Sequence, residues 1–259
     1  MFEKYLKYIK TIRTKNTYEQ YKRALELFEG KPATMETALE IVNRDDLSTN
    51  TKKQYLNVWT MALSFEGKAD KKLIALTKSL KPEEKISAVP TKEEVYKCIN
   101  SAKNAQFRLV IALMAFAGLR VGEVVKIKLQ DIEDDKFFLR ETKTHMQRAA
   151  VISSSLKPYL DEWLDDKNRN PGAYLFTNPK GGIYTEGYFK EQVKKACKAA
   201  GYGQFHCHSF RHFFATTIFK ASGNNLVLTA NACGHKSVAT TKRYIRVETG
   251  DILAAANMF

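Results

Sequence analysis

The stretch LVIALMAFAGL, residues 109–119, is the longest strongly apolar run in this chain of 259 residues. Its 11 residues fall well short of the about 20 that a membrane-spanning helix requires. Gly118, near its end, can adopt the left-handed backbone conformation that ends a helix. The run therefore predicts a buried core helix in a globular domain, and we expect no membrane partner.

Most of the remaining sequence also predicts helices. Apolar residues recur at helical spacing behind two N-terminal cap signals, Asn16 with Glu19 and Thr51 with Gln54. Together with shorter helices, these segments predict a small all-α bundle in the first part of the chain. Helices are also expected at 35–43, 70–80, 92–102, 105–117, 121–127, 153–167, 186–200, 209–221, 225–233 and 238–246.

Two segments predict β structure. In KFFLRETKTHMQRAAVIS, residues 136–153, short apolar runs flank a polar centre, as in a hairpin. The segment GAYLFTNPKGG, residues 172–182, predicts a further strand and turn. The fold class is therefore mainly α with a small antiparallel β-sheet.

The segment LKPEEKISAVPTKEE, residues 80–94, combines prolines and charges in the way typical of a linker. We expect an all-α bundle at 1–82, a linker at 83–90 and a mixed, mostly α domain at 91–259.

The charge of the chain points to a polyanionic partner. Lys and Arg number 42 against 28 Asp and Glu, which gives a net charge of +14 and a pI of about 9.5. Residues 1–90 hold 17 basic and 12 acidic side chains, net +5, which leaves +9 for the remainder. Nucleic acid is the leading partner class, although a basic surface also attracts anionic membranes or serves solubility. Two basic regions favour a clamp around one polyanion.

The cysteines give information about the compartment. Their positions contain no C-x-x-C pair, and no signal peptide is recognised at the start of the sequence. We therefore expect free thiols and a cytoplasmic location. The four are Cys98, Cys197, Cys207 and Cys233.

The stretch HSFRHFFATT, residues 208–217, places His208, Arg211 and His212 at the start of an apolar helix. His208 and Arg211 are one helical turn apart, at an end whose free N–H groups favour anions. A polar helix cap centred on Ser209 and a metal site are the alternatives. The sequence lacks the paired spacing of a zinc site, so we expect no metal there.

Two further basic residues are candidates for phosphate chemistry. Arg120 follows the core helix, where it either neutralises the helix dipole or is held by a bidentate pair with Glu123. Lys143, at the expected hairpin tip, is either a solvated surface lysine or a general acid.

A tyrosine completes the set of candidates. In ACGHKSVATTKRYIRV, residues 232–247, Gly234 ends a helix, His235 follows in the turn, and Tyr244 comes nine residues later. A tyrosine in this position is either half-buried packing or a nucleophile. The chain has no Ser-His-Asp order, no cluster of metal carboxylates and no Gly-rich phosphate loop, which makes a tyrosine nucleophile chemically reasonable and leaves both interpretations open.

The elements AGLRVGE, TKT, HSFRH and GH, with a tyrosine nine residues beyond the last histidine, resemble the tyrosine recombinase (phage-integrase) family. The ordered set covers about 125 residues, and the two-part organisation extends the resemblance over most of the chain. It implies a helical, SAM-like core-binding domain and a catalytic domain of the DNA breaking-rejoining enzyme fold. The size resembles compact two-domain members of the Xer and Cre type.

The resemblance also implies roles for the candidate residues. Tyr244 would attack phosphorus and form a 3′-phosphotyrosyl bond, while Arg120 and Arg211 hold the non-bridging oxygens. Lys143, rather than Lys136, would protonate the leaving oxygen. The histidines at 208 and 235 would hydrogen-bond the phosphate, with His208 also accepting the tyrosine proton. Neither ATP nor a divalent metal would be required, and no cofactor is expected.

The expected partner is double-stranded DNA at a specific recombination site. The resemblance implies a homotetramer on DNA and a monomer or dimer when free. The alternatives are a type IB topoisomerase-like relaxing enzyme and a non-catalytic DNA-binding protein. The sequence departs from the family pattern at Ala232, Cys233 and Arg246. The apolar end of DILAAANMF, residues 251–259, would pack on its own domain or on a neighbouring protomer.

Overall fold

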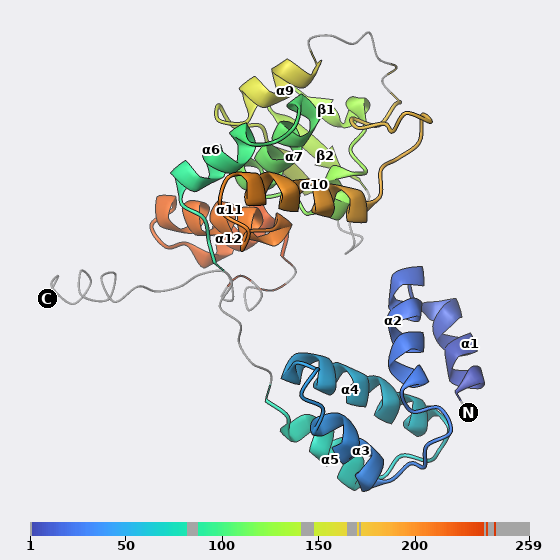
Figure 1. Ribbon diagram of the computed structural model, residues 1–259. Coiled ribbons are helices and arrows are strands. Elements are labelled where there is room, and N and C mark those ends of the chain that lie inside the picture. The colour runs from blue at the N-terminus through green and yellow to red at the C-terminus, as the bar shows by residue number, and fades with distance from the viewer. Residues whose placement is uncertain are drawn as a thin grey trace, which may run out of the picture. The chain divides into compact units, whose positions relative to one another are not determined.

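The structure is a computed structural model that describes residues 2–81, 88–140, 148–164, 170, 172–235, 237 and 241. The hairpin tip, most of the helix expected at 238–246 and the C-terminal segment lie outside these residues. The chain divides into two compact units, Met1–Ile86 and Ser87–Phe259, here called unit 1 and unit 2 (Figure 1). The break falls within the segment expected to be a linker.

The described residues of unit 1 form an α-helical bundle. Its helices are α1 (Glu3–Ile12), α2 (Lys15–Glu26), α3 (Met35–Val42), α4 (Thr49–Phe65) and α5 (Lys71–Ser79). The side chain of the residue before each of α2 to α5 accepts a hydrogen bond from a first-turn N–H, which stabilises that helix end. These caps are Thr14, Thr34, Ser48 and Asp70.

Two predicted caps in unit 1 are wrong. Thr14 has an extended backbone and caps α2, so Asn16 lies inside the helix. Ser48 similarly caps α4 ahead of Thr51. In both cases a Thr or Ser two or three positions before the predicted cap accepts the hydrogen bond from the first-turn N–H. Each helix therefore begins earlier than the sequence predicted. Helix α1 was not predicted, although Tyr5 and Ile9 are buried at helical spacing.

The core of unit 1 is built around stacked aromatic rings. The rings of Phe28 and Trp59 stack with centroids 4.4 Å apart and planes 7° from parallel, and both side chains are fully buried. Such pairs add a favourable ring interaction to the burial of a large apolar area. Apolar packing therefore holds this unit together.

Unit 2 is mostly helical and contains one small sheet. Its helices are α6 (Lys92–Asn100), α7 (Ala105–Phe116), α8 (Val121–Val124), α9 (Lys157–Leu164), α10 (Glu186–Ala199), α11 (Cys207–Ala221) and α12 (Leu226–Cys233), with a 3₁₀ turn η1 (Leu129–Asp131). Helix α7 contacts α6, α8, α9, α10 and α11 (Figure 1). Nine of its residues are buried, which confirms the core helix predicted from the apolar run.

The sheet has the order β1 (Ile132–Glu133), β2 (Lys136–Leu139) and β3 (Arg148–Val151), with antiparallel neighbours. Strands β2 and β3 confirm the predicted hairpin, and Leu139 pairs with Arg148 at the end nearest its tip. The strand predicted at 172–182 is wrong. That segment forms only the isolated bridges Lys128 to Tyr174 and Thr177 to Ile183, because a turn at Asn178–Gly182 interrupts it.

None of the helices within the described ranges combines the length and apolar character needed to cross a membrane. All four cysteines are buried free thiols.

Candidate active site

The predicted site residues come from three distant segments of unit 2. Arg120 lies between α7 and α8, Arg211 and His208 lie on the first turns of α11, and His235 follows α12. Lys143 and Tyr244 lie outside the described residues.

The turn after α7 supplies a backbone acceptor to the site. Gly118 adopts the predicted left-handed conformation, with φ +63°, and a Cβ at this position would collide with the ring of Phe214. Its carbonyl oxygen accepts hydrogen bonds from Arg211 Nη1 and from Arg148 Nη2. The glycine thus lets two guanidinium groups approach the end of α7.

Arg120 is held by Glu123, but not through the predicted bidentate pair. Glu123 Oε1 accepts from Arg120 Nη1 at 2.9 Å, and Oε2 accepts from the Arg120 backbone N–H at 2.8 Å. Arg120 precedes the first residue of α8 and Glu123 is the third residue of the helix, so the carboxylate caps the helix with one oxygen. The alternative, in which Arg120 neutralises the dipole at the end of α7, is wrong. Arg120 lies at the cap position of α8.

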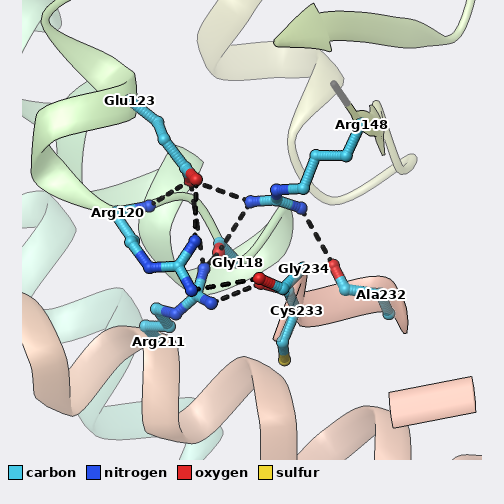
Figure 2. Close-up of polar contacts among 8 residues, drawn as sticks. All are labelled: Gly118, Arg120, Glu123, Arg148, Arg211, Ala232, Cys233 and Gly234. Carbon is cyan, nitrogen blue, oxygen red and sulfur yellow. Dashed lines mark hydrogen bonds and ion pairs between the residues drawn. The ribbon is translucent and has the colours of Figure 1, made fainter. Parts of the chain in front are cut away.

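Glu123 is the centre of a cluster of three arginines (Figure 2). Besides Arg120, Arg148 Nη2 donates to Glu123 Oε2 at 2.9 Å, and Arg211 Nη1 lies 4.0 Å from the same oxygen. Arg211 is 1% exposed and Glu123 is 4% exposed. Three guanidinium charges against one carboxylate leave the cluster at +2, so it favours an anion nearby.

The end of α12 closes the cluster from the other side (Figure 2). Three consecutive carbonyl oxygens each accept from a different guanidinium group, as expected of the unpaired acceptors at a helix C-terminus. The pairs are Ala232 with Arg148 (3.0 Å), Cys233 with Arg211, and Gly234 with Arg120 (3.1 Å). The arginines therefore join α12 to the α7–α8 turn.

His235 is placed by this helix end. Gly234 ends α12 in the left-handed conformation, with φ +60°, and His235 follows directly. The His235 Nδ1 and Thr241 Oγ1 atoms are 2.9 Å apart, within hydrogen-bond distance. The imidazole is thus held beside the arginine cluster.

Helix α11 starts at Cys207, two residues earlier than predicted, so Ser209, the helix cap in the alternative interpretation, is instead the third residue of the helix. Its cap position is His206, whose ring Nδ1 lies 3.1 Å from Ser209 Oγ. His208 therefore lies in the first turn, where free N–H groups favour anions. Among the described residues no group of three His, Cys, Asp or Glu side chains is arranged to hold a metal ion.

Both histidines have lowered pKa values. Burial, followed by the charges of Arg211 and Arg120, lowers the pKa of His235 to about 4. Burial, followed by His206 and Arg211, also lowers the pKa of His208. Both imidazoles are therefore neutral at pH 7 and can donate or accept a proton.

Burial and the neighbouring charges also shift the pKa values of Arg211 and Glu123. Burial, followed by the charge of Arg120, lowers the pKa of Arg211 to about 10. Burial alone would raise the pKa of Glu123, but Arg148 and the other hydrogen-bond partners bring it below its usual value. Arg211 Nε has no acceptor within the part of the chain that the structure describes. This cationic cluster is suited to the charged oxygens of a phosphate.

Sequence reasoning missed Arg148. It is the first residue of β3, and its burial alternates with that of its neighbours, so Arg148 and the buried Ala150 share the inward face. A basic residue at an inward strand position was the signal that could have revealed it. Lys136, set aside in favour of Lys143, has a half-exposed side chain near Asp135.

Comparison with known proteins identifies the class. Residues 89–250 match the phage integrase family, and the chain belongs to that family. The matched range includes positions 120, 143, 208, 211, 235 and 244. The resemblance stated from the sequence motifs is therefore confirmed.

Two curated relatives with similar sequences are named tyrosine recombinases. The chain is 31% identical to "Tyrosine recombinase XerH" of Campylobacter jejuni over 186 residues, covering 67% of this chain and 52% of that protein. It is 31% identical to "Tyrosine recombinase XerA" of Pyrococcus horikoshii over 165 residues, covering 61% and 56%. The chain thus spans about half the length of the curated relatives it matches.

Solved structures share the fold. XerH bound to its difH substrate in a pre-cleavage complex has a TM-score of 0.71 at 23% identity, covering 98% of this chain and 82% of that one. A lambda integrase (75–356) dimer bound to a COC′ core site has a TM-score of 0.77 at 20% identity, covering 95% and 97%. These likenesses confirm the predicted mainly α fold with its small antiparallel sheet.

Proposed function

We propose that the protein is a site-specific tyrosine recombinase or integrase that cleaves and rejoins DNA through a 3′-phosphotyrosyl intermediate. One observation carries the proposal. Arg120, His208, Arg211 and His235, which lie up to 115 positions apart in the sequence, gather around one buried cluster with a charge of +2 at the start of α11. A cationic cluster of this kind stabilises the charge that concentrates on a phosphate in the transition state.

The reaction assigns one task to each residue. The Oη of Tyr244 attacks phosphorus, the bond to the 5′ oxygen breaks, and Lys143 gives that oxygen a proton. His208 accepts the tyrosine proton, since its lowered pKa keeps the imidazole neutral at pH 7. Arg120 and Arg211 hold the non-bridging oxygens, and His235 donates a further hydrogen bond to the phosphate.

The proposal includes independence from ATP and from divalent metal ions. The energy of the broken phosphodiester is retained in the phosphotyrosyl bond, so the reverse attack by a 5′-hydroxyl needs no external energy source. The guanidinium groups neutralise phosphate charge, which is a task that metal ions perform in other phosphoryl transfers.

The proposed partner is double-stranded DNA at a specific site, bound by a homotetramer. Each active site cuts one strand, so exchange between two duplexes requires four protomers. One relative in the structural comparison is a lambda integrase tetramer bound to a Holliday junction, with a TM-score of 0.78 at 20% identity. We assign residues 1–82 to core-site binding, 83–90 to the linker and 91–259 to catalysis.

The test uses DNA from the native genomic neighbourhood that carries a nick close to each candidate cleavage position. Cleavage then releases a short fragment that diffuses away, so its 5′-hydroxyl cannot reverse the reaction and the adduct accumulates. We expect a covalent protein–DNA adduct with wild-type protein, in EDTA and without ATP. Tyr244→Phe should abolish the adduct while keeping DNA binding, because only the nucleophilic oxygen is removed. An adduct at the 3′ end that persists in Tyr244→Phe would contradict the assignment.

The other readings predict different products. A type IB topoisomerase would relax supercoiled plasmid without site preference and without recombinant products. A DNA-binding protein without catalysis would bind the same DNA and give no adduct. Site-dependent recombinant products from wild-type protein are the result expected of a recombinase.

A further inference from the structure

Arg148 has no role in the proposed chemistry, although it lies where β3, the α7–α8 turn and the end of α12 meet. It begins β3, pairs with Leu139 across the hairpin, and its side chain is 10% exposed. A guanidinium group this deeply buried needs acceptors to offset the loss of hydration. Its contacts show where those acceptors lie.

The contacts of Arg148 join three segments of the site (Figure 2). Nη2 donates to Glu123 Oε2 at 2.9 Å and to the Gly118 carbonyl at 3.4 Å, and Nη1 donates to the Ala232 carbonyl at 3.0 Å. The carboxylate it contacts is the one that holds Arg120, and the carbonyl it contacts lies three residues before His235. Arg148 therefore tethers both predicted phosphate-binding elements to the sheet.

The side chain of Arg148 also packs against the Gly234 turn. A Cβ at Gly234 would collide with Arg148 Cδ and lie 2.7 Å from Nε. The guanidinium and its stem thus fill the space beside the left-handed residue that gives His235 its direction. Without this support a glycine in a turn has the greatest conformational freedom of any residue.

We propose that Arg148 is a positioning residue for the strand cleavage proposed above. It fixes the 232–235 turn and the Glu123 carboxylate, so that His235 and Arg120 face the same phosphate, and it does not itself contact DNA. The inference rests on the proposed function. It assigns to Arg148 a role separate from that of Arg120, whose side chain is 25% exposed and accessible to a phosphate.

The test compares two substitutions with a matched control. Arg148→Gln removes the charge and most donors, whereas Arg148→Lys keeps the charge but cannot reach Glu123 and Ala232 together. The control is Arg140→Gln, because Arg140 lies just beyond β2 in the same hairpin, pairs with Asp131 at 2.9 Å and has a side chain that is 59% exposed.

At saturating nicked DNA we expect Arg148→Gln to cleave about a hundredfold more slowly, since displacements of about 1 Å at a reacting centre have effects of this size. Arg148→Lys should be intermediate, and Arg140→Gln should match the wild type. The DNA dissociation constant and its salt dependence should be unchanged in both Arg148 variants.

Several results would overturn the proposal. One is wild-type cleavage by folded Arg148→Gln. Another is a salt slope reduced by about 1, which would show that Arg148 contacts a phosphate. If Arg148→Gln fails to fold, a wild-type cleavage rate in Arg148→Lys would overturn it instead.

An NMR titration of His235 separates this inference from the proposed function. We expect Arg148→Gln, and not Arg140→Gln, to raise the pKa of His235 and to broaden or shift its ring resonances at pH 7. If the wild-type protein failed to cleave DNA, the proposed function would fall, while this titration would still show whether Arg148 positions the turn. An unchanged His235 titration in folded Arg148→Gln would overturn the inference.

Discussion

The two units bury different kinds of polar group. In the described part of unit 1 the buried polar side chains are three threonines, each donating to a backbone carbonyl: Thr37 to Pro32, Thr60 to Leu56 and Thr77 to Leu73, all at 2.9 Å. In unit 2 they include the charged residues Glu123, Asp131 and Arg211.

This difference separates a unit whose core is apolar from a unit that also buries charged side chains. Buried ion pairs are often no better for stability than apolar packing of the same volume, because both charges lose their hydration. Unit 1 reaches a stable core through stacked rings such as Phe28 and Trp59. We attribute the buried charges of Glu123 and Arg211 to the anion that the site is proposed to receive, whereas Asp131 pairs with Arg140 outside the site.

The stabilities of the two units can be measured separately in the same chain, because it contains two tryptophans, one in each unit. Trp59 lies in unit 1, and Trp163, which donates to the Leu175 carbonyl at 3.0 Å, lies in unit 2. Trp163→Phe leaves a fluorescence reporter in unit 1, and Trp59→Phe leaves one in unit 2. Denaturant titrations in these two backgrounds give the free energy of unfolding of each unit.

The largest expected effect comes from Glu123→Gln. This change leaves Arg120 and the more deeply buried Arg148 and Arg211 without their shared carboxylate, and breaking a buried ion pair costs about 3–5 kcal/mol. Unit 2 should lose this much stability, while the unit 1 transition stays in place. The counterpart in unit 1, Thr60→Val, should cost only about 1 kcal/mol, the value of one neutral hydrogen bond. Equal losses for the two substitutions would contradict the contrast between the units.

A smaller difference in stability is expected between alanine substitutions at two glycines that have a left-handed backbone conformation, Gly67 and Gly118. Gly67→Ala in unit 1 should cost about 1–2 kcal/mol, because its φ is +71° but nothing lies within 4 Å of the added Cβ. Gly118→Ala should cost about 1–3 kcal/mol more, since the Cβ would strike the Phe214 ring. It should also slow DNA cleavage by moving the carbonyl that Arg148 and Arg211 share. If both alanines were equally tolerated, the close packing at Gly118 would be disproved.

The smallest expected effect is a difference in acid sensitivity. All five histidines lie after residue 87, and in the folded protein the pKa of His235 is about 4, below the usual value of 6.5. The unfolded chain therefore binds more protons between these values, so unit 2 loses stability as the pH falls from about 6.5 to about 4. Unit 1 should show no such histidine-dependent loss.

The measurement is the denaturant midpoint of each tryptophan reporter at pH 7 and pH 5. His235→Gln should weaken the pH dependence of unit 2, because the titrating group is gone. An undiminished dependence in that variant would assign the effect to other groups.

Local patterns in the sequence were sufficient for much of the fold. The apolar run at 109–119 predicted α7, because a helix buried on all sides needs no polar face. The apolar runs on either side of residues 141–147 predicted the β2–β3 pairing. Caps were less predictable, since Thr14 and Asn16 can both cap the same helix end, and it is the extended backbone at Thr14 that makes this residue the cap. The strand expected at 172–182 failed because the turn at Asn178–Gly182 interrupts it and leaves only isolated bridges.

The candidate site was predictable only in part. Arg120, His208, Arg211 and His235 were found through ordered motifs, and the structure gathers them. Arg148 and the three acceptor carbonyls could not be predicted, because they depend on where β3 and the end of α12 meet in space. Lys143 and Tyr244 stay predictions from the sequence.

The proposed function requires that the cationic cluster receive a single DNA phosphate. The sharpest test is a structure of the Tyr244→Phe protein bound to its uncleaved DNA site. We expect the non-bridging oxygens of the scissile phosphate at about 3 Å from guanidinium nitrogens of Arg120 and Arg211, with His208 and His235 beside them. A scissile phosphate bound elsewhere, with these groups still bonded only to Glu123 and to backbone carbonyls, would contradict it.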